Sequence, residues 1–142
     1  MLKQWCILIV LLSIYSCNRD KDRFKETEDN DLVIQIFRME QTLQDSGIVN
    51  FRLKIIPKKS INRLISKDLH EKLLYRMDSS FYLLEGKNKI YPVLIQSIAN
   101  GNTRNYEYLI SVEADDMLLR KAKLVYQDKY LTKKQYDLTR KK

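Results

Sequence analysis

Few residues in this chain are suited to nucleophilic catalysis. His70 is the single histidine, and the two cysteines are Cys6 and Cys17. A serine or cysteine triad needs a base beside its nucleophile, so His70 would have to serve in any such site. No serine is followed three residues later by lysine, which excludes the serine–lysine motif. Because charged residues surround His70 on a presumed helix, we interpret it as a solvated helix residue.

Acidic residues allow metal binding or acid–base chemistry only in particular arrangements. Asp115 and Asp116 are adjacent, without the alternating spacing of a calcium loop, and we interpret them as a helix start. Histidine and cysteine are too few for a zinc site of those ligands. The glycines, Gly47, Gly86 and Gly101, are too far apart for a phosphate-binding loop. We therefore expect no cofactor and no metal, whereas hydrolysis by two carboxylates stays open because acids converge only in three dimensions.

The first residues have the pattern of a secretory signal. Lys3 precedes an apolar run of eleven residues, Trp5–Tyr15, and small Ser16 precedes Cys17. A helix that spans a bilayer needs roughly 20 apolar residues, which argues against a membrane-spanning segment. A buried core helix is disfavoured, because it would leave charges unpartnered at both ends.

The junction Ile14-Tyr15-Ser16-Cys17 resembles the lipobox of bacterial lipoproteins. The resemblance implies cleavage after a signal peptide at 1–16 and acylation of Cys17 with fatty acids such as palmitate. Cys6 would then be lost, so the mature chain could form no internal disulfide. Asn18 after the cysteine implies the outer membrane, facing the periplasm or the surface. An ordinary cleaved signal is the alternative.

Residues 17–30 are predicted to be an acylated cysteine followed by a flexible tether. From Asn18 to Asn30 the chain has nine charges of both signs and one aromatic residue, Phe24. Such a composition buries too little apolar surface to order itself.

The folded domain is predicted at 31–131, and its first half contains two strands and a helix. Leu32–Gln41 favours a strand over a helix, with a β-bulge where the apolar phase slips. Alternation over Ile48–Ile56 predicts a half-buried strand that forms a hairpin with the first. A helix with a core-facing stripe is expected at about 61–77, with Ser60 as its N-cap, unless Ser66 starts a second helix.

The second half is rich in predicted strands, at Phe81–Glu85, Ile90–Ile98, Tyr106–Glu113 and Ala122–Tyr126. A helical turn is predicted at Ala114–Leu119. This spacing predicts a mainly β fold, an antiparallel sandwich with one inserted helix, and an α+β fold is the alternative. The stretches Phe-Tyr-Leu-Leu-Glu-Gly-Lys-Asn-Lys-Ile-Tyr-Pro and Lys-Leu-Val-Tyr-Gln-Asp resemble immunoglobulin-like extracytoplasmic domains of bacterial lipoproteins over residues 81–128. That resemblance implies a domain that binds or scaffolds.

The positive charge is concentrated at the C-terminus, where 132–142 is predicted to be a basic tail. The chain has a net charge of +8, and its last 26 residues contain nine basic and two acidic residues. The candidates for binding an anionic surface are Lys121, Lys123, Lys129, Lys133, Lys134, Arg140, Lys141 and Lys142. Lipid headgroups, an acidic envelope polymer or an envelope protein would suit them, and a solvated tail is the alternative. Interleaved tyrosines also suit single-stranded nucleic acid, which an exported protein seldom meets, so we expect no such partner.

These observations predict a small lipoprotein, lipid-anchored in the cell envelope, with a non-catalytic binding or scaffolding domain. An envelope hydrolase that uses carboxylates is one alternative. An envelope immunity or inhibitor protein is another alternative, and it differs from the predicted binding or scaffolding lipoprotein only in its partner.

Overall fold

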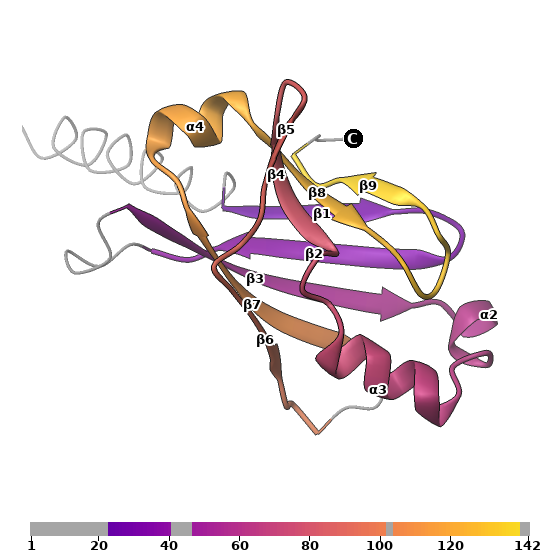
Figure 1. Cartoon of the computed structure of the whole chain (residues 1–142). Coiled ribbons are helices and arrows are strands. Elements are labelled where there is room, and N and C mark those ends of the chain that lie inside the picture. Colours follow the sequence, from indigo (N-terminus) through magenta and orange to yellow (C-terminus); the bar gives the residue numbers. More distant parts are fainter. Residues whose placement is uncertain (1–22, 41–46, 102–103, 140–142) are drawn as a thin grey trace, which may run out of the picture.

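The computed structural model describes residues 23–40, 47–101 and 104–139, which form two antiparallel β-sheets packed face to face (Figure 1). The larger sheet has the order β1 (Phe24–Glu28), β2 (Leu32–Arg38), β3 (Ile48–Pro57), β7 (Tyr106–Glu113), β6 (Leu94–Ile98). The smaller sheet has the order β5 (Asn88–Ile90), β4 (Phe81–Glu85), β8 (Lys123–Gln127), β9 (Gln135–Asp137). The predicted mainly β, antiparallel sandwich with an inserted helical segment is confirmed.

The order of the strands differs from that of an immunoglobulin domain. The first three strands form a meander within the larger sheet. In the immunoglobulin fold, the third strand lies in the sheet opposite the first two. The sandwich architecture is therefore shared, but the connectivity is not.

Strand β1 corrects the prediction of a flexible tether at 17–30. Residues 24–28 pair along their whole length with β2, from Phe24 opposite Phe37 to Glu28 opposite Val33. An edge strand gains its order from the backbone hydrogen bonds that its neighbour offers, so a charged, alternating segment can pair without a hydrophobic signal of its own. The signal peptide and Cys17 lie outside the described residues.

Strand β2 shows no bulge at the predicted position. The register with β3 continues through Phe37, opposite Arg52, to Arg38, opposite Phe51. The slip in the apolar pattern arises because Phe37 faces outward and is 39% exposed.

The predicted helix at 61–77 is two helices, α2 (Lys59–Asn62) and α3 (Lys67–Tyr75). Ser66 is the N-cap of α3, where its side-chain oxygen accepts a hydrogen bond from the Leu69 amide at 3.2 Å. Ser60 lies inside α2 and caps nothing, so the alternative with a second helix at Ser66 is correct. Helix α3 lies beside the smaller sheet on the inner side of β7 (Figure 1). There the Tyr108 hydroxyl donates to the Leu73 carbonyl at 2.6 Å.

The predicted strand Ile90–Ile98 is divided between the two sheets. Strand β5 ends at Ile90 in the smaller sheet, and β6 begins at Leu94 in the larger one. Pro92 lies between them and has no backbone N–H for a sheet ladder, which explains the break. Helix α4 (Asp116–Lys121) begins as predicted, with Asp115 accepting from the Leu118 amide at 2.7 Å.

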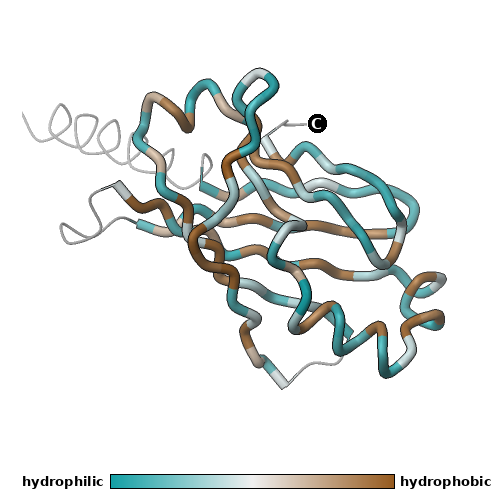
Figure 2. The backbone as a smooth tube through the Cα atoms, in the orientation of Figure 1, coloured by the Kyte–Doolittle hydropathy of each residue, from teal (hydrophilic) through white to brown (hydrophobic). Residues whose placement is uncertain are grey.

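The core lies between the two sheets, where the hydrophobic stretches of the strands face one another (Figure 2). Its centre is aromatic: Phe81 stacks on Tyr126 with ring centroids 5.0 Å apart, and Tyr126 stacks on Tyr136 at 5.8 Å. Phe81 also meets Tyr108 in a tilted arrangement at 5.7 Å. These rings join both sheets, since Tyr108 belongs to β7 and the other three belong to β4, β8 and β9.

Candidate functional site

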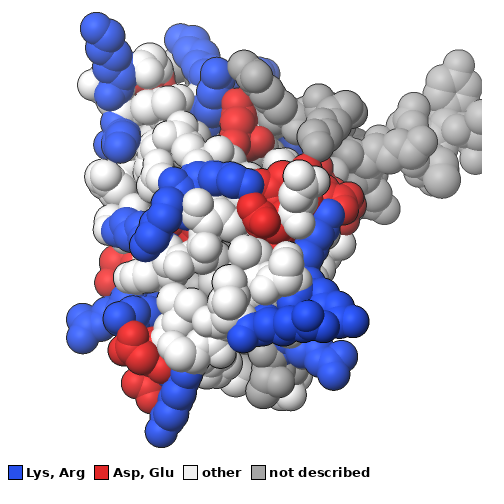
Figure 3. Space-filling view, turned by 90° about the vertical axis from the view of Figure 1, so that its right-hand side faces the viewer, with Lys and Arg blue, Asp and Glu red and all other residues white. Residues whose placement is uncertain are grey.

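The predicted basic residues do not form one surface. We call the end of the sandwich with Arg23, Arg38 and α4 the α4 end, and the end with α2 and the loops β1–β2 and β8–β9 the α2 end. Lys121 and Lys123 lie at the α4 end, whereas the β8–β9 loop carries Lys129, Lys133 and Lys134 to the α2 end. The prediction of a basic tail at 132–142 is wrong in its described part, because Gln135–Asp137 form β9 of the smaller sheet. Arg140, Lys141 and Lys142 lie outside the described residues. Figure 3 shows the α2 end, where Lys and Arg surround an uncharged area and Asp and Glu lie among them.

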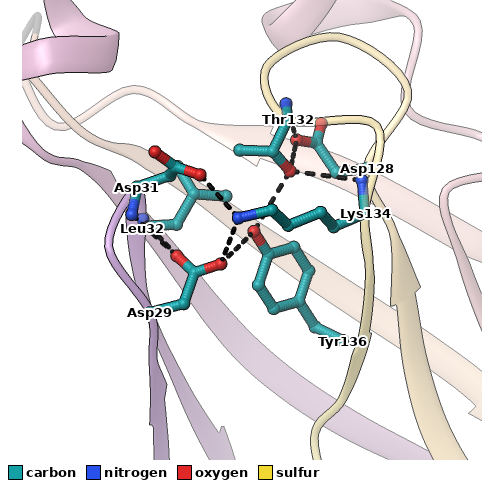
Figure 4. Close-up of polar contacts among 7 residues, drawn as sticks. All are labelled: Asp29, Asp31, Leu32, Asp128, Thr132, Lys134 and Tyr136. Atoms are coloured by element: carbon teal, nitrogen blue, oxygen red, sulfur yellow. Dashed lines mark hydrogen bonds and ion pairs between the residues drawn. The ribbon is translucent and has the colours of Figure 1, made fainter.

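Lys134 is held in ion pairs (Figure 4). Its ammonium lies 2.9 Å from Asp29 and 2.6 Å from Asp31, both in the turn between β1 and β2. The Tyr136 hydroxyl donates to Asp29 at 3.1 Å. Two backbone amides, of Asp31 and Leu32, donate to the other Asp29 oxygen at 2.8 and 2.9 Å. Lys134 therefore joins the β8–β9 loop to the β1–β2 turn and is not available as an independent anion-binding residue.

The same contacts set the protonation of this cluster. Burial alone would raise the pKa of Asp29, but hydrogen bonds from the Leu32 amide, Lys134 and others outweigh it and hold that pKa far below its usual range. Hydrogen bonds to Asp31 and Asp29 raise the pKa of Lys134. Burial raises the pKa of Tyr136 to about 12. Asp29 and Lys134 are thus fixed in their charged forms, which suits a structural lock and not an acid that donates protons.

Asp128 organises the β8–β9 loop from inside. Asp128 is only 1% exposed. One of its carboxylate oxygens accepts hydrogen bonds from the Tyr126 hydroxyl at 3.0 Å and from the Tyr130 and Leu131 amides at 3.0 and 3.1 Å. The Thr132 hydroxyl donates to its other oxygen at 2.7 Å. A buried carboxylate is tolerated when donors surround it in this way. This acidic residue is therefore a structural anchor of the loop.

A pocket of about 120 Å³ opens between the two sheets at the α4 end. Its walls come from β2, β3, β4, β8, the C-terminal end of α4 and the residues after β9. The apolar wall residues are Ile36, Phe51, Leu83, Leu119, Ala122, Leu124 and Leu138. A mostly apolar pocket with a few polar groups at its rim is the usual form of a small-molecule site.

Three cations face inward at the rim of this pocket. Lys25 is opposite Ile36 and Arg38 is opposite Phe51, so both side chains lie on the inner face of the larger sheet. The Arg23 carbonyl accepts from the Arg38 amide at 2.8 Å, which continues the pairing and places Arg23 on the same face. All three line the pocket.

The acidic partners of these cations point toward solvent. Arg38 pairs with Asp116 at 2.9 Å, and Arg23 pairs with Glu40. The side chains of Asp116 and Glu40 are 72% and 74% exposed. The Lys25 ammonium donates to the Thr139 carbonyl at 3.3 Å and has no ion pair with any residue in the described ranges.

The outer face of the larger sheet holds a second charged cluster. Glu107 is 8% exposed. Its carboxylate accepts hydrogen bonds from the Arg52 guanidinium at 2.7 and 3.2 Å and from the Asn100 side-chain amide at 2.9 Å. The Lys54 ammonium lies 3.7 Å from the same carboxylate. The hydrogen bond from Arg52 is the largest influence and lowers the pKa of Glu107 below its usual value. Glu107 is therefore an ionised partner of two cations, not a proton donor.

Apolar side chains are also exposed on this outer face. Phe24 and Phe37 are directly opposite each other across β1 and β2 and are 48% and 39% exposed. Met39 follows on the same side, and its amide donates to the Asn50 carbonyl at 2.9 Å. We call Phe24, Phe37 and Met39 the outer patch. Exposed apolar patches of this kind suit contacts with another protein.

His70 is not the solvated residue that we predicted. Its Nδ1 lies 2.9 Å from the Tyr106 hydroxyl, and the two rings are tilted with centroids 5.5 Å apart. Tyr106 faces the inside of the sandwich, which no helical pattern around His70 could indicate. No serine or cysteine within the described part of the chain has a hydrogen bond to this histidine, so the geometry there is not that of a triad.

Residues 23–40, 47–101 and 104–139 contain no candidate metal site and no candidate membrane-spanning helix. Within these ranges no group of three or more His, Cys, Asp and Glu side chains could hold a metal ion. No helix there has the length and hydrophobicity needed to cross a bilayer.

Comparison of the chain with protein-family models, curated proteins and solved structures gave no match.

The inward cations at the pocket were missed by sequence reasoning. Arg23 and Lys25 alternate with Phe24 and Glu26, which is the period of a strand, but both sets are too polar to show which face is buried. Only the pairing with Ile36 and Arg38 reveals that the cations face the core. The alternation therefore indicated a strand, but without hydrophobic contrast between its two faces it did not show which face is buried.

Proposed function

We propose that this chain is a small lipoprotein of the cell envelope, anchored through acylated Cys17, whose sandwich is a non-catalytic binding or scaffolding module. The observation that carries the binding role is the apolar pocket with Arg23, Lys25 and Arg38 facing inward at its rim. The outer-membrane location and the absence of a catalytic role are parts of the same proposal. They are supported by the lipobox-like residues Ile14-Tyr15-Ser16-Cys17 and by the arrangement of the acidic residues.

The acidic residues favour this proposal over the hydrolase. Hydrolysis by two carboxylates requires one of them to keep a proton, which needs a raised pKa. The pKa values of Asp29, Glu40 and Glu107 are instead lowered, because a cation or a backbone amide donates hydrogen bonds to each carboxylate. Each therefore supports ion pairing and not proton donation.

The position of the pocket is compatible with an anchor at Cys17. A chain spans at most about 3.3 to 3.6 Å per residue, so the six steps from Cys17 to Arg23 span at most about 22 Å. Arg23 lines the pocket at the α4 end. Under this proposal the mouth of the pocket stays close to the membrane that holds the acyl chains.

The anchor is tested by expression of the full chain in a bacterium that processes lipoproteins, followed by intact-mass spectrometry. We expect a mature chain that begins at Cys17 and carries the mass of the added acyl groups, in the membrane fraction. Cys17→Ala should remove the added mass and release the protein from that fraction. A mature chain that keeps its first sixteen residues, or a Cys17→Ala variant that stays membrane-bound, would contradict the proposal.

A further inference from the structure

We infer that the pocket at the α4 end binds an anionic amphiphile, a molecule with a short apolar chain or ring and one carboxylate or phosphate head. This inference rests on the proposed binding function, but not on the acylation of Cys17. The apolar part would lie against Ile36, Phe51, Leu83 and Leu124, and the head would lie at the cationic rim.

The interior of the pocket determines the apolar part of the ligand. Its volume is about 120 Å³, somewhat less than the 150 Å³ of an engineered apolar cavity that admits benzene. It therefore accepts one short chain segment or one small ring. Its cationic rim is in contact with solvent, since the side chains of Arg23 and Arg38 are 32% and 37% exposed, so the rest of a longer chain can extend outward.

The rim determines the charge of the ligand. A cation that faces apolar walls loses hydration, and an anion in the pocket would compensate for that loss. An inward lysine on an edge strand also discourages strand pairing between molecules, and this role alone would account for Lys25. It does not account for Arg38, which lies on β2 between two neighbouring strands. The convergence of Lys25 and Arg38 from two strands, with Arg23 directly before β1, therefore indicates recognition of an anion.

The partners already present would not prevent binding. The ion pairs of Arg23 with Glu40 and of Arg38 with Asp116 involve highly exposed carboxylates, and pairs of this kind contribute little to stability. Within the described residues, Lys25 donates to the Thr139 carbonyl at 3.3 Å and forms no ion pair. An incoming carboxylate or phosphate can therefore replace weak interactions with charged hydrogen bonds in a less hydrated position.

A polymer or an extended peptide fits these features less well. A polyanion would leave the apolar walls unused. A peptide along a strand edge would need one pocket for every second side chain, whereas the pocket between the sheets has room for one short segment. The favoured sources of the ligand are a free fatty acid and an anionic membrane phospholipid, which share an apolar chain and an anionic head.

The test measures binding of octanoate to the chain from residue 17 onward with Cys17→Ser, by isothermal titration calorimetry. Octanol, of equal chain length, and octylamine, of opposite charge, are the matched ligands. We expect octanoate to bind at least about tenfold more tightly than either. Equal affinity for octanoate and octanol would overturn the inference, because the rim would then not recognise charge.

Variants locate the binding. Lys25→Gln and Arg38→Gln should each weaken octanoate binding about tenfold, as expected for the loss of one charged hydrogen bond. Ala122→Leu places a larger side chain in the pocket wall and should abolish it. Lys59→Gln at the α2 end is the control and should leave the affinity unchanged. Unchanged binding in Lys25→Gln and Arg38→Gln, or an equal loss in Lys59→Gln, would overturn the inference.

Two further measurements complete the test. One locates the binding site without relying on the Ala122→Leu variant, and the other identifies the source of the ligand. Octanoate should shift the amide resonances of Leu83 and Leu138 in the unmodified pocket, and shifts confined to other regions would contradict the site even if Ala122→Leu fails to fold. Vesicles of anionic phospholipid should compete with octanoate if membrane lipid is a source, and the free fatty acid is the source if they do not. Octanoate binding by a protein that proves not to be acylated would leave this inference standing while the proposed anchor fails. An acylated protein that does not bind octanoate would overturn this inference while the proposed anchor stands.

Discussion

The ammonium of Lys134 lies 2.9 Å from the carboxylate of Asp29, 105 positions earlier in the chain. These residues adjoin β9 and β1, which are edge strands of different sheets. A second contact joins the same two regions toward the α4 end, where Lys25 donates to the Thr139 carbonyl at 3.3 Å. The first and last described strands are therefore linked along one side of the sandwich.

This relationship predicts a loss of stability in acid. The pKa of Asp29 is lowered in the folded protein relative to its ordinary value of 3.8, so the stabilisation is complete above that value. As the pH falls below it, the unfolded chain takes up a proton that the folded protein does not, and the free energy of unfolding decreases. Urea unfolding from pH 6 to pH 2 should show this decrease, and Asp29→Asn should make the curve flatter. An equally steep decrease of the free energy of unfolding in Asp29→Asn would contradict the attribution of this pH dependence to Asp29.

Replacement of Asp128 by alanine should destabilise the protein by about 2 to 3 kcal/mol. The change leaves the amides of Tyr130 and Leu131 without the buried acceptor that they now share. The midpoint of urea unfolding measures this effect. Asp78→Ala is the matched control, because Asp78 is exposed, and it should change the midpoint little.

The contact between Tyr108 and α3 predicts a local effect on the helix. Tyr108→Phe removes a buried hydrogen bond of 2.6 Å to the Leu73 carbonyl and should cost about 1 to 2 kcal/mol. Amide hydrogen exchange should accelerate in α3 more than in β2. Tyr75→Phe is the control, since Tyr75 is 70% exposed at the end of the same helix. Uniform acceleration in both elements would indicate only global destabilisation.

The division of the helical segment predicts unequal effects for two serines. Ser66→Ala removes the N-cap of α3 and should destabilise the protein by about 1 kcal/mol. Ser60→Ala should have almost no effect, because Ser60 lies inside α2 and its hydroxyl caps no helix. Thermal unfolding of the two variants gives the comparison. Equal losses would indicate that α2 and α3 are not separate helices.

Local chemistry determined many of the elements in advance. The alternation of Val49, Phe51 and Leu53 predicted β3, and that of Tyr106 and Tyr108 predicted β7, because the inward-facing residues of each strand are apolar and alternate with polar ones. The cap of α4 at an aspartate was also predictable, since its donor lies only three residues away.

Tertiary structure decided the features whose partners are distant in sequence. The pairing of β1, the inward direction of Lys25 and Arg38 and the contact of Lys134 with Asp29 depend on strands brought together by folding. The separation of Lys121 from Lys134 to opposite ends follows from the direction of β8, although both lie in one basic region of the sequence. Charge composition counts residues but carries no direction. Only a backbone placed in its sheet assigns each charge to a face, an end or a pocket.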